Sequence, residues 1–168
     1  MAPQRIAAYV VTLSDTRDAS NDTSGDAIQS LLEAAGHAIG GREILREDPA
    51  TLEPALQRIL ARGDVDVVLL TGGTGIAPRD LTYDLLARLY ERPLPGFGEL
   101  FRRLSYDEIG SAAMLSRASA GVASGKAIFS MPGSRGAVRL AMEALVLPEL
   151  GHVVGELRRV TPSRGANP

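Results

Sequence analysis

The hydrophobic positions along this chain follow two alternating spacings, and their order predicts an α/β fold. Short apolar runs cover residues 6–13 and 65–71, as expected of strands that are buried on both faces. A weaker run covers residues 37–45. Between these runs, in the segments 22–36 and 49–63, apolar residues recur three and four positions apart, which is helical spacing. Strands that alternate with helices in this way form a parallel sheet with right-handed crossovers.

The second half of the chain continues this pattern with more interruptions. Residues 81–91 have helical spacing, and a further helix is predicted from Phe97, after a break that contains proline and glycine. Two strands are predicted to form a hairpin around Ser124 and Gly125. A helix follows, and we expect Pro148 to interrupt it before a last short helix.

These elements predict a single domain over residues 1–160 and a flexible tail over residues 161–168. The expected fold class is α/β, a three-layer αβα sandwich with a mostly parallel sheet and a short hairpin or edge extension. A chain of 168 residues is long enough to bury a hydrophobic core. The tail is polar and contains proline and glycine, which is typical of frayed chain ends.

Composition narrows the possible functions. The chain has 18 Lys and Arg against 20 Asp and Glu, with 4% aromatic residues, which argues against a nucleic-acid partner because binding needs a basic surface and stacking aromatics. The absence of Cys excludes thiolate metal sites and a cysteine nucleophile. The apolar runs are shorter than the ~18 residues of a membrane span, and the N-terminal run lacks a signal-peptide cleavage pattern. We therefore expect a cytoplasmic protein without a membrane partner.

The candidate chemistry lies where the predicted strands end. In open parallel sheets, ligands bind beyond the carboxyl ends of the strands, near a switch in strand order. The run Thr71, Gly72, Gly73, Thr74 and Gly75 follows the clearest strand, but it matches neither a P-loop nor a dinucleotide fingerprint. Its glycines allow backbone N–H groups to approach a phosphate closely, and the two threonines add hydroxyl donors. The alternative is a tight structural connection between strand and helix.

Charged residues lie on both sides of this glycine loop. Asp80 stands just before a helix, where it either caps that helix or binds Mg²⁺ beside a phosphate, since this cation prefers oxygen ligands. Glu47 and Asp48 end the second strand, and they either face solvent or supply a second carboxylate to the same cation. Arg79 is either a surface charge or a phosphate partner.

Two further loops are expected at the same edge of the sheet. Ser14 and Asp15 follow the first strand. The turn Pro132, Gly133 and Ser134 separates a strand from a helix N-terminus. There it either binds an anion or starts the helix with Ser134 as its cap.

Four segments of the chain resemble a known family in order and spacing. They are VVTLSDTR…DTSGDAI, VVLLTGGTGIAPRDLTYDLL, RPLPGFGELFRRLSYDEIGSAAMLSR and SMPGSRGAVRLAMEAL. With them the chain resembles the molybdenum cofactor biosynthesis proteins of MoaB/Mog type from residue 5 to about residue 155, and its short length is more similar to the MoaB branch. The resemblance implies a molybdopterin-binding fold and adenylyl transfer from Mg-ATP to the molybdopterin phosphate, giving adenylylated molybdopterin and pyrophosphate.

The resemblance also implies roles for particular residues. The family's catalytic acidic residue after the glycine loop falls on Asp80. A second acidic residue follows the second strand, where this chain has Glu47 in place of the usual Asp, with Asp48 as its neighbour. Either of these two residues would bind Mg²⁺ together with Asp80. The remaining strand-end residues would bind molybdopterin and ATP: Ser14, Asp15, Thr71, Gly72, Gly73, Thr74, Gly75, Pro132, Gly133 and Ser134.

Alternatives to this enzyme remain open at the level of sequence. One is a non-catalytic molybdopterin-binding or carrier protein of the same pathway, and another is a generic nucleotide-binding domain of flavodoxin-like architecture. The resemblance further implies a homo-oligomer, either a trimer or a dimer of trimers, and the molybdenum-insertion protein as a partner. The apolar residues Phe97, Leu100, Phe101 and Met114 either pack on a neighbouring copy or belong to the core of the monomer.

Overall fold

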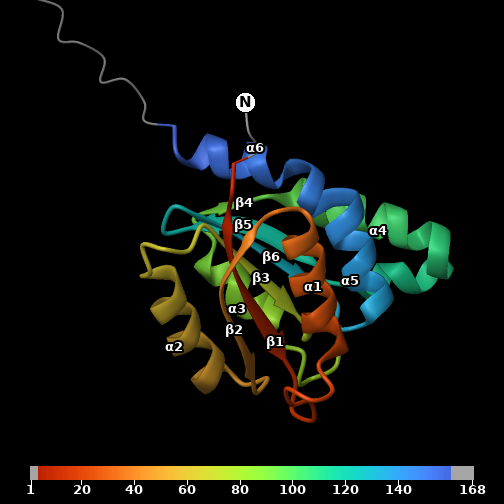
Figure 1. Cartoon of the computed structure of the whole chain (residues 1–168). Helices are drawn as coiled ribbons and strands as arrows, with labels where there is room; N and C mark the ends of the chain where they lie inside the picture. Colours follow the sequence, from red (N-terminus) through yellow and green to blue (C-terminus); the bar gives the residue numbers. More distant parts are fainter. Residues whose placement is uncertain (1–3, 160–168) are drawn as a thin grey trace, which may run out of the picture.

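The computed structural model describes residues 4–159, and the predicted alternation of strands and helices is present there (Figure 1). The strands are β1 (Ala7–Leu13), β2 (Ala38–Leu45), β3 (Val67–Thr71), β4 (Arg92–Pro93), β5 (Ser119–Ala123) and β6 (Lys126–Met131). The helices are α1 (Thr23–Ala34), α2 (Pro49–Leu60), α3 (Thr82–Leu89), α4 (Pro95–Ile109), α5 (Arg135–Ala141) and α6 (Leu147–Leu157). A 3₁₀ turn, η1 (Gly110–Leu115), follows α4, and a π-helical turn, η2 (Met142–Val146), joins α5 to α6. The tail predicted at 161–168 lies outside the described residues.

All six strands form one sheet in the order β2-β1-β3-β6-β5-β4. β2, β1, β3 and β6 run parallel, and β5 and β4 extend the sheet by antiparallel pairing. The hairpin between β5 and β6 turns at Ser124 and Gly125, whose φ angles are 50° and 71°. Two consecutive positive φ angles are what a two-residue type I′ turn requires. The predicted parallel sheet with a hairpin extension is therefore confirmed.

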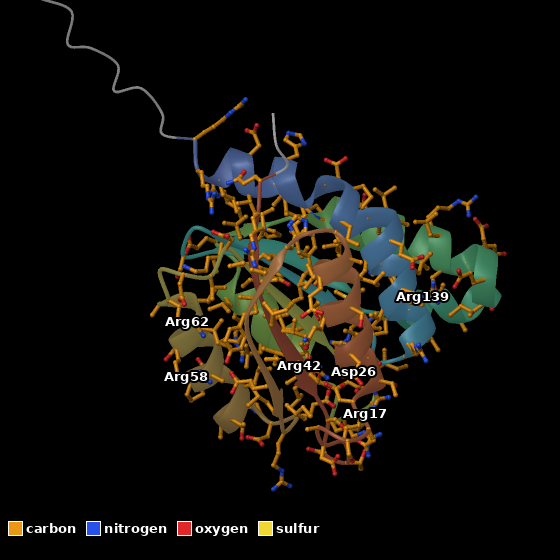
Figure 2. All side chains as sticks on the ribbon, viewed as in Figure 1. Arg17, Asp26, Arg42, Arg58, Arg62 and Arg139 are labelled. Carbon is orange, nitrogen blue, oxygen red and sulfur yellow. The ribbon has the colours of Figure 1, made fainter. Side chains whose placement is uncertain are left out.

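The loop that leads into α1 is fastened to the sheet by a buried carboxylate. Asp22 is fully buried and accepts hydrogen bonds from the hydroxyl of Thr12 and from the N–H of Gly25. Arg42 of β2 pairs with Asp22 and with Asp26, each at 2.8 Å, and Figure 2 shows Arg42 and Asp26 close together. The first turn of α1 is thereby held beside the end of β1.

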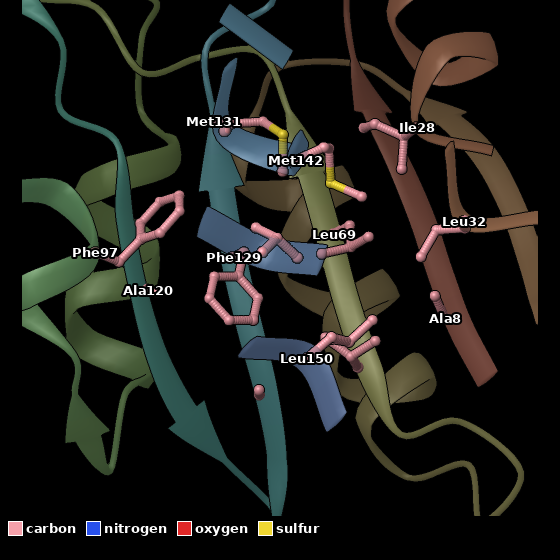
Figure 3. Packing of buried hydrophobic residues seen from close by; sticks show 14 of the residues in the cluster. Ala8, Ile28, Leu32, Leu69, Phe97, Ala120, Phe129, Met131, Met142 and Leu150 are labelled. Carbon is pink, nitrogen blue, oxygen red and sulfur yellow. The ribbon is translucent and has the colours of Figure 1, made fainter. Parts of the chain in front are cut away.

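The sheet divides the core into two layers. Along β3, Val67 and Leu69 pack into the cluster beneath α1, α4, α5 and α6, whereas Val68 and Leu70 pack beneath α2 and α3. Figure 3 shows the first cluster, where Leu69 lies among side chains of the helices and of the neighbouring strands. Because helices cover both faces, β3 is buried at every position. This arrangement confirms the three-layer αβα sandwich.

Prolines at two helix starts account for the differences from the predicted boundaries. α4 begins at Pro95 rather than at Phe97, and Pro148 lies in the first turn of α6 without interrupting the helical run from α5. Proline is tolerated at the start of α4 because the first turn has no intrahelical partner for its missing N–H, whereas Pro148 follows the π-helical turn η2. Within residues 4–159, no helix is both long enough and apolar enough to cross a lipid bilayer.

The carboxyl ends of the four parallel strands lie side by side. Thr71 of β3 pairs with Thr12 of β1 on one side and with Met131 of β6 on the other, and Leu13 pairs with Leu45 of β2. The loops that follow these strands therefore emerge at one edge of the sheet. The chain passes outward from β1 to β2 and then returns to β3 on the other side of β1. This reversal is the switch point at which open α/β sheets bind ligands.

Candidate functional site

A cavity of about 580 Å³ opens at the switch point. Its walls are the loops that follow β1, β2, β3 and β6, together with the end of η1. It brings together nearly all the residues that the sequence suggested for binding: Ser14, Asp15, Glu47, Thr71, Gly72, Gly73, Thr74, Gly75, Asp80, Pro132, Gly133 and Ser134. Arg79 lines the same cavity, whereas Asp48 does not.

Asp48 instead caps the N-terminus of α2. One of its carboxylate oxygens accepts a hydrogen bond from the N–H of Thr51 at 2.8 Å, and the other accepts one from the Thr51 hydroxyl at 2.9 Å. Of the two alternatives for the second carboxylate, Glu47 therefore lines the cavity and Asp48 does not. The sequence carried a signal for this outcome, because an Asp followed by Pro49 is typical of a helix start.

Glu47 lies in the cavity with an unsatisfied carboxylate oxygen. Its Oε1 is buried and has no hydrogen-bond partner within residues 4–159. Burial raises the pKa of Glu47 to about 7, assisted by the negative charges of Asp80 and Asp15 and opposed by Arg79. The backbone N–H of Glu47 donates to Asp15 at 3.2 Å, which keeps the two loops together. A cation bound here would offset the charges that raise this pKa.

Asp80 does not cap α3, and the capping interpretation is therefore wrong. Its Oδ2 accepts a hydrogen bond from the N–H of Ala77 at 2.9 Å, while the capping position belongs to Leu81. The carboxylate thus turns back over its own loop. It lies against Gly75, where an added Cβ would come within 2.6 Å of Oδ2. Asp80 and Glu47 consequently lie on the same side of the glycine loop, close enough for the charge of Asp80 to act on Glu47.

The path of the glycine loop leaves no room for side chains. Gly72 and Gly73 have φ angles of 109° and 67°, which other residues rarely adopt. A Cβ on Gly72 would lie 2.4 Å from the carbonyl oxygen of Leu13. A Cβ on Gly73 would lie 2.2 Å from Oε1 of Glu47 and 2.1 Å from the hydroxyl of Thr82. The loop is thus pressed between β1 and the carboxylates.

Some of the hydrogen-bond donors expected of this loop are used within the protein. The N–H of Gly72 donates to the carbonyl of Met131 at 3.0 Å, and the hydroxyl of Thr71 donates to the carbonyl of Pro132 at 2.9 Å. These bonds tie the loop to the end of β6, so the donor role expected of Thr71 is corrected. In the part of the chain that the structure describes, the amides of residues 73–75 have no acceptor, which leaves them free for an anion.

The turn at 132–134 adjoins the glycine loop. Ser134 accepts a hydrogen bond from the N–H of Ala137 at 3.2 Å, so it caps α5, which was one of the two alternatives for this turn. An added Cβ on Gly133 would lie 3.5 Å from the Cα of Gly72, so the two loops are in contact. The turn therefore both starts a helix and forms a wall of the cavity.

Arg117, which no sequence signal singled out, fastens the glycine loop from outside. Its backbone N–H donates to Thr74 at 2.7 Å, and its guanidinium donates to the carbonyls of Gly75 and Asp80. The same guanidinium pairs with the carboxylate of Asp84 at 3.0 Å. Because Arg117 follows η1, far along the chain, only the tertiary structure reveals this clamp. Other cavity residues that the sequence did not single out are Thr12, Leu13, Thr16, Arg17, Leu115 and Ser116.

Comparisons with known proteins agree with this fold. A family model described as a probable molybdopterin binding domain matches residues 9–152. Molybdenum cofactor biosynthesis protein B of Bacillus subtilis is 51% identical over 163 residues, which cover 94% of each chain. A crystal structure of a molybdenum cofactor biosynthesis protein B has a TM-score of 0.92 at 49% identity, covering 95% of this chain and 100% of that one. The tungsten cofactor synthesizing protein MoaB from Pyrococcus furiosus has a TM-score of 0.82 at 34% identity, covering 94% and 100%.

Proposed function

This chain belongs to the molybdenum cofactor biosynthesis family of MoaB/Mog type, and from that premise we propose that it transfers an adenylyl group from Mg-ATP to the phosphate of molybdopterin. The products are adenylylated molybdopterin and pyrophosphate. One observation carries the proposal: two carboxylates and the unpaired amides of the glycine loop line a single cavity at the switch point of the sheet. We place the reaction in the cytoplasm, where ATP is plentiful.

The residues present fit a magnesium ion. Mg²⁺ takes oxygen ligands and needs only one or two carboxylates when substrate phosphates and water complete its shell. Glu47 offers a buried oxygen without a partner, and Asp80 offers a carboxylate beside it. Among residues 4–159 no group of three or more His, Cys, Asp or Glu is arranged to hold a metal by itself. The ion is therefore expected to bind together with the phosphates, whose crowded negative charge it would offset.

Backbone amides and side chains of this protein position the two substrates. In the reaction, an oxygen of the molybdopterin phosphate bonds to the α-phosphorus of ATP, and the bond from that phosphorus to the bridging oxygen breaks as pyrophosphate leaves. Little of this needs covalent help from the protein, so orientation and charge stabilisation dominate. The amides of residues 73–75 would hold phosphate oxygens. Arg117 would keep those amides and Asp80 in fixed positions.

The experiment is to incubate the purified protein with molybdopterin, ATP and Mg²⁺ and to measure pyrophosphate and adenylylated pterin. We expect both products in equal amounts, and neither when ATP is omitted. If the protein binds molybdopterin tightly but releases no pyrophosphate, the enzyme is excluded and a carrier remains. Binding of flavin in place of molybdopterin would favour a generic nucleotide-binding domain instead.

The second candidate function is a non-catalytic molybdopterin-binding or carrier protein. The observation that favours it is Glu47, which stands where the family that this chain resembles usually has Asp. A longer side chain shifts the carboxylate relative to the glycine loop, and alignment matters more for transfer than for binding. A carrier would deliver the pterin to the molybdenum-insertion protein, which remains our proposed further partner.

We also propose a homo-oligomer, a trimer or a dimer of trimers, built on the outer face of α4 and η1. The apolar residues suggested for this contact divide into two groups. Phe97 and Phe101 lie in the core, whereas Leu100 and Met114 are 55% and 77% exposed. Contiguous exposed apolar surface is typical of protein interfaces, so we propose these two elements for the contact. Tyr106, Ile109 and Leu115 are exposed on the same two elements.

A further inference from the structure

The cavity contains a second charged region besides the carboxylates. Arg17 lies in the loop between β1 and α1, at the edge where β1 ends (Figure 2), and its side chain lines the cavity. Its backbone N–H donates to the hydroxyl oxygen of Ser14 at 3.0 Å, which fixes the loop at the end of the strand. Arg17 therefore stands among the strand-end residues that line the cavity.

A buried serine connects the guanidinium of Arg17 to the opposite loop. Nη1 of Arg17 donates to the hydroxyl oxygen of Ser24 at 3.0 Å, and that hydroxyl donates to the carbonyl of Gly133 at 2.7 Å. Ser24 is fully buried. A serine hydroxyl has one proton, and Ser24 donates it to Gly133. The Ser24 oxygen can therefore only accept the hydrogen bond from Arg17. This relay holds the arginine beside the turn at 132–134.

The charge of Arg17 has no internal partner. Within residues 4–159 it pairs with no carboxylate, whereas Arg42 and Arg117 both do. A guanidinium presents five N–H groups in a plane, and the bond to Ser24 uses one of them. The remaining N–H groups can pair with two phosphate oxygens at once. The amides of Gly133 and Ser134 lie on the same side of the cavity and have no acceptor in the described residues.

We propose that Arg17, positioned by Ser24, binds a phosphate group directly, in a subsite that needs no divalent cation. The carboxylates Glu47 and Asp80 require a cation before an anion can approach them, whereas the Arg17 side of the cavity does not. The shared chemistry is a phosphate ester, which comes either from the pterin phosphomonoester or from ATP. The existence of this subsite does not depend on adenylyl transfer. Only the identity of its ligand rests on the proposed function.

Isothermal titration calorimetry in the presence of EDTA tests this subsite. One arm titrates ATP and the other titrates a pterin phosphomonoester, each into the wild-type protein, Arg17→Gln and Arg17→Lys. In the arm whose phosphate Arg17 holds, we expect Arg17→Gln to weaken affinity about 10- to 100-fold, the effect of losing charge-assisted hydrogen bonds. Arg17→Lys should recover part of this loss, because it keeps the charge but not the planar pair of donors.

Two further variants separate the subsite from general charge effects. Arg88→Gln removes a charge from an exposed position in the last turn of α3 and should leave both affinities within about 2-fold of wild type. Ser24→Ala should weaken the same ligand by several-fold while Arg17 remains. Since Ser24 is buried, a thermal melt of this variant should accompany the titration, and Arg17→Gln decides the question if Ser24→Ala does not fold.

The outcome is independent of adenylyl transfer. If wild-type protein binds neither ligand in EDTA, or if Arg17→Gln binds both as tightly as wild type, the subsite does not exist. If Arg17→Gln weakens one ligand while the wild-type protein makes no pyrophosphate, the subsite stands and the transferase fails. Loss of affinity for ATP alone, or for the pterin ester alone, shows which phosphate Arg17 holds.

Discussion

Glu47 and Asp80 lie beside each other at the glycine loop, and burial together with the charge of Asp80 raises the pKa of Glu47 to about 7. Glu47 follows β2 and Asp80 follows β3, and these two strands are separated in the sheet by β1. Their meeting depends on the loops that fold back over the end of β1. Two carboxyl groups so placed are costly unless a proton or a cation lies between them.

The raised pKa predicts that stability depends on pH through Glu47. Its ordinary pKa is 4.5, so between about pH 4.5 and pH 7 the folded protein binds more protons than the unfolded chain. The free energy of unfolding therefore falls as pH rises through this window. Glu47→Gln should be more stable than wild type by about 1–2 kcal/mol at pH 8, because solvent screens part of the cost of ionising Glu47. At pH 4 the two proteins should be equally stable. Urea unfolding in EDTA at both pH values measures this, and an equal difference at pH 4 and pH 8 would contradict it.

Gly73→Ala should disrupt the site. The new methyl group would collide with Oε1 of Glu47 and with the hydroxyl of Thr82, and the backbone has a positive φ. We expect a loss of about 1–3 kcal/mol of stability, measured by urea unfolding, together with loss of ligand binding. Gly151→Ala on α6, where a Cβ meets open space, is the matched control and should be neutral or stabilise by up to about 1 kcal/mol. If both variants behave alike, the loop is not as tightly packed as described.

Arg117→Lys should slow catalysis without abolishing binding. A lysine ammonium cannot reach the carbonyls of Gly75 and Asp80 and the carboxylate of Asp84 at the same time. The glycine loop should then lose its fixed position, so we expect kcat for adenylyl transfer to fall about 10-fold while KM for ATP changes about 2-fold or less. Arg88→Lys, at an exposed position of α3, is the control. A wild-type kcat in Arg117→Lys would show that the clamp has no part in the reaction.

Leu100→Glu should break the proposed oligomer. The residue is exposed on α4, so a charge there leaves the core of the monomer intact but cannot be buried against a second copy. Sedimentation velocity should show a trimer or larger species for wild type and for the control Ala50→Glu on α2, and a monomer for Leu100→Glu. A wild-type protein that sediments only as a monomer removes the oligomer from the account.

Much of this architecture follows from simple patterns. β3 is apolar at nearly every position because both faces of the sheet are covered, and the glycine loop after it marks the carboxyl end of a parallel strand. Since parallel strands end at one edge, the residues after β1, β3 and β6 were expected to converge, and the cavity contains them. The position of the site thus follows from the order and direction of the strands, without knowledge of the side-chain packing.

The remaining features depend on contacts that no local pattern encodes. Glu47 and Asp48 are neighbours, and although Pro49 favours Asp48 as a helix cap, only the tertiary structure shows that Glu47 lines the cavity. The contribution of Arg117 arises because the segment after η1 packs against the glycine loop. Arg17 acquires its place through a buried hydroxyl that joins α1 to the turn after β6. Each of these contacts is made by segments far apart in the sequence or by a choice between adjacent residues.

The measurement that tests the central claim most directly is pyrophosphate release from molybdopterin, ATP and Mg²⁺ by three variants that each remove one negative charge. Asp80→Asn and Glu47→Gln should each lower the rate at least about 100-fold, because each loses a carboxylate of the shared cavity. Asp48→Asn differs from wild type only at the cap of α2 and should keep a rate within about 2-fold of it. Equal rates in Asp80→Asn and wild type, or a loss confined to Asp48→Asn, would contradict the account.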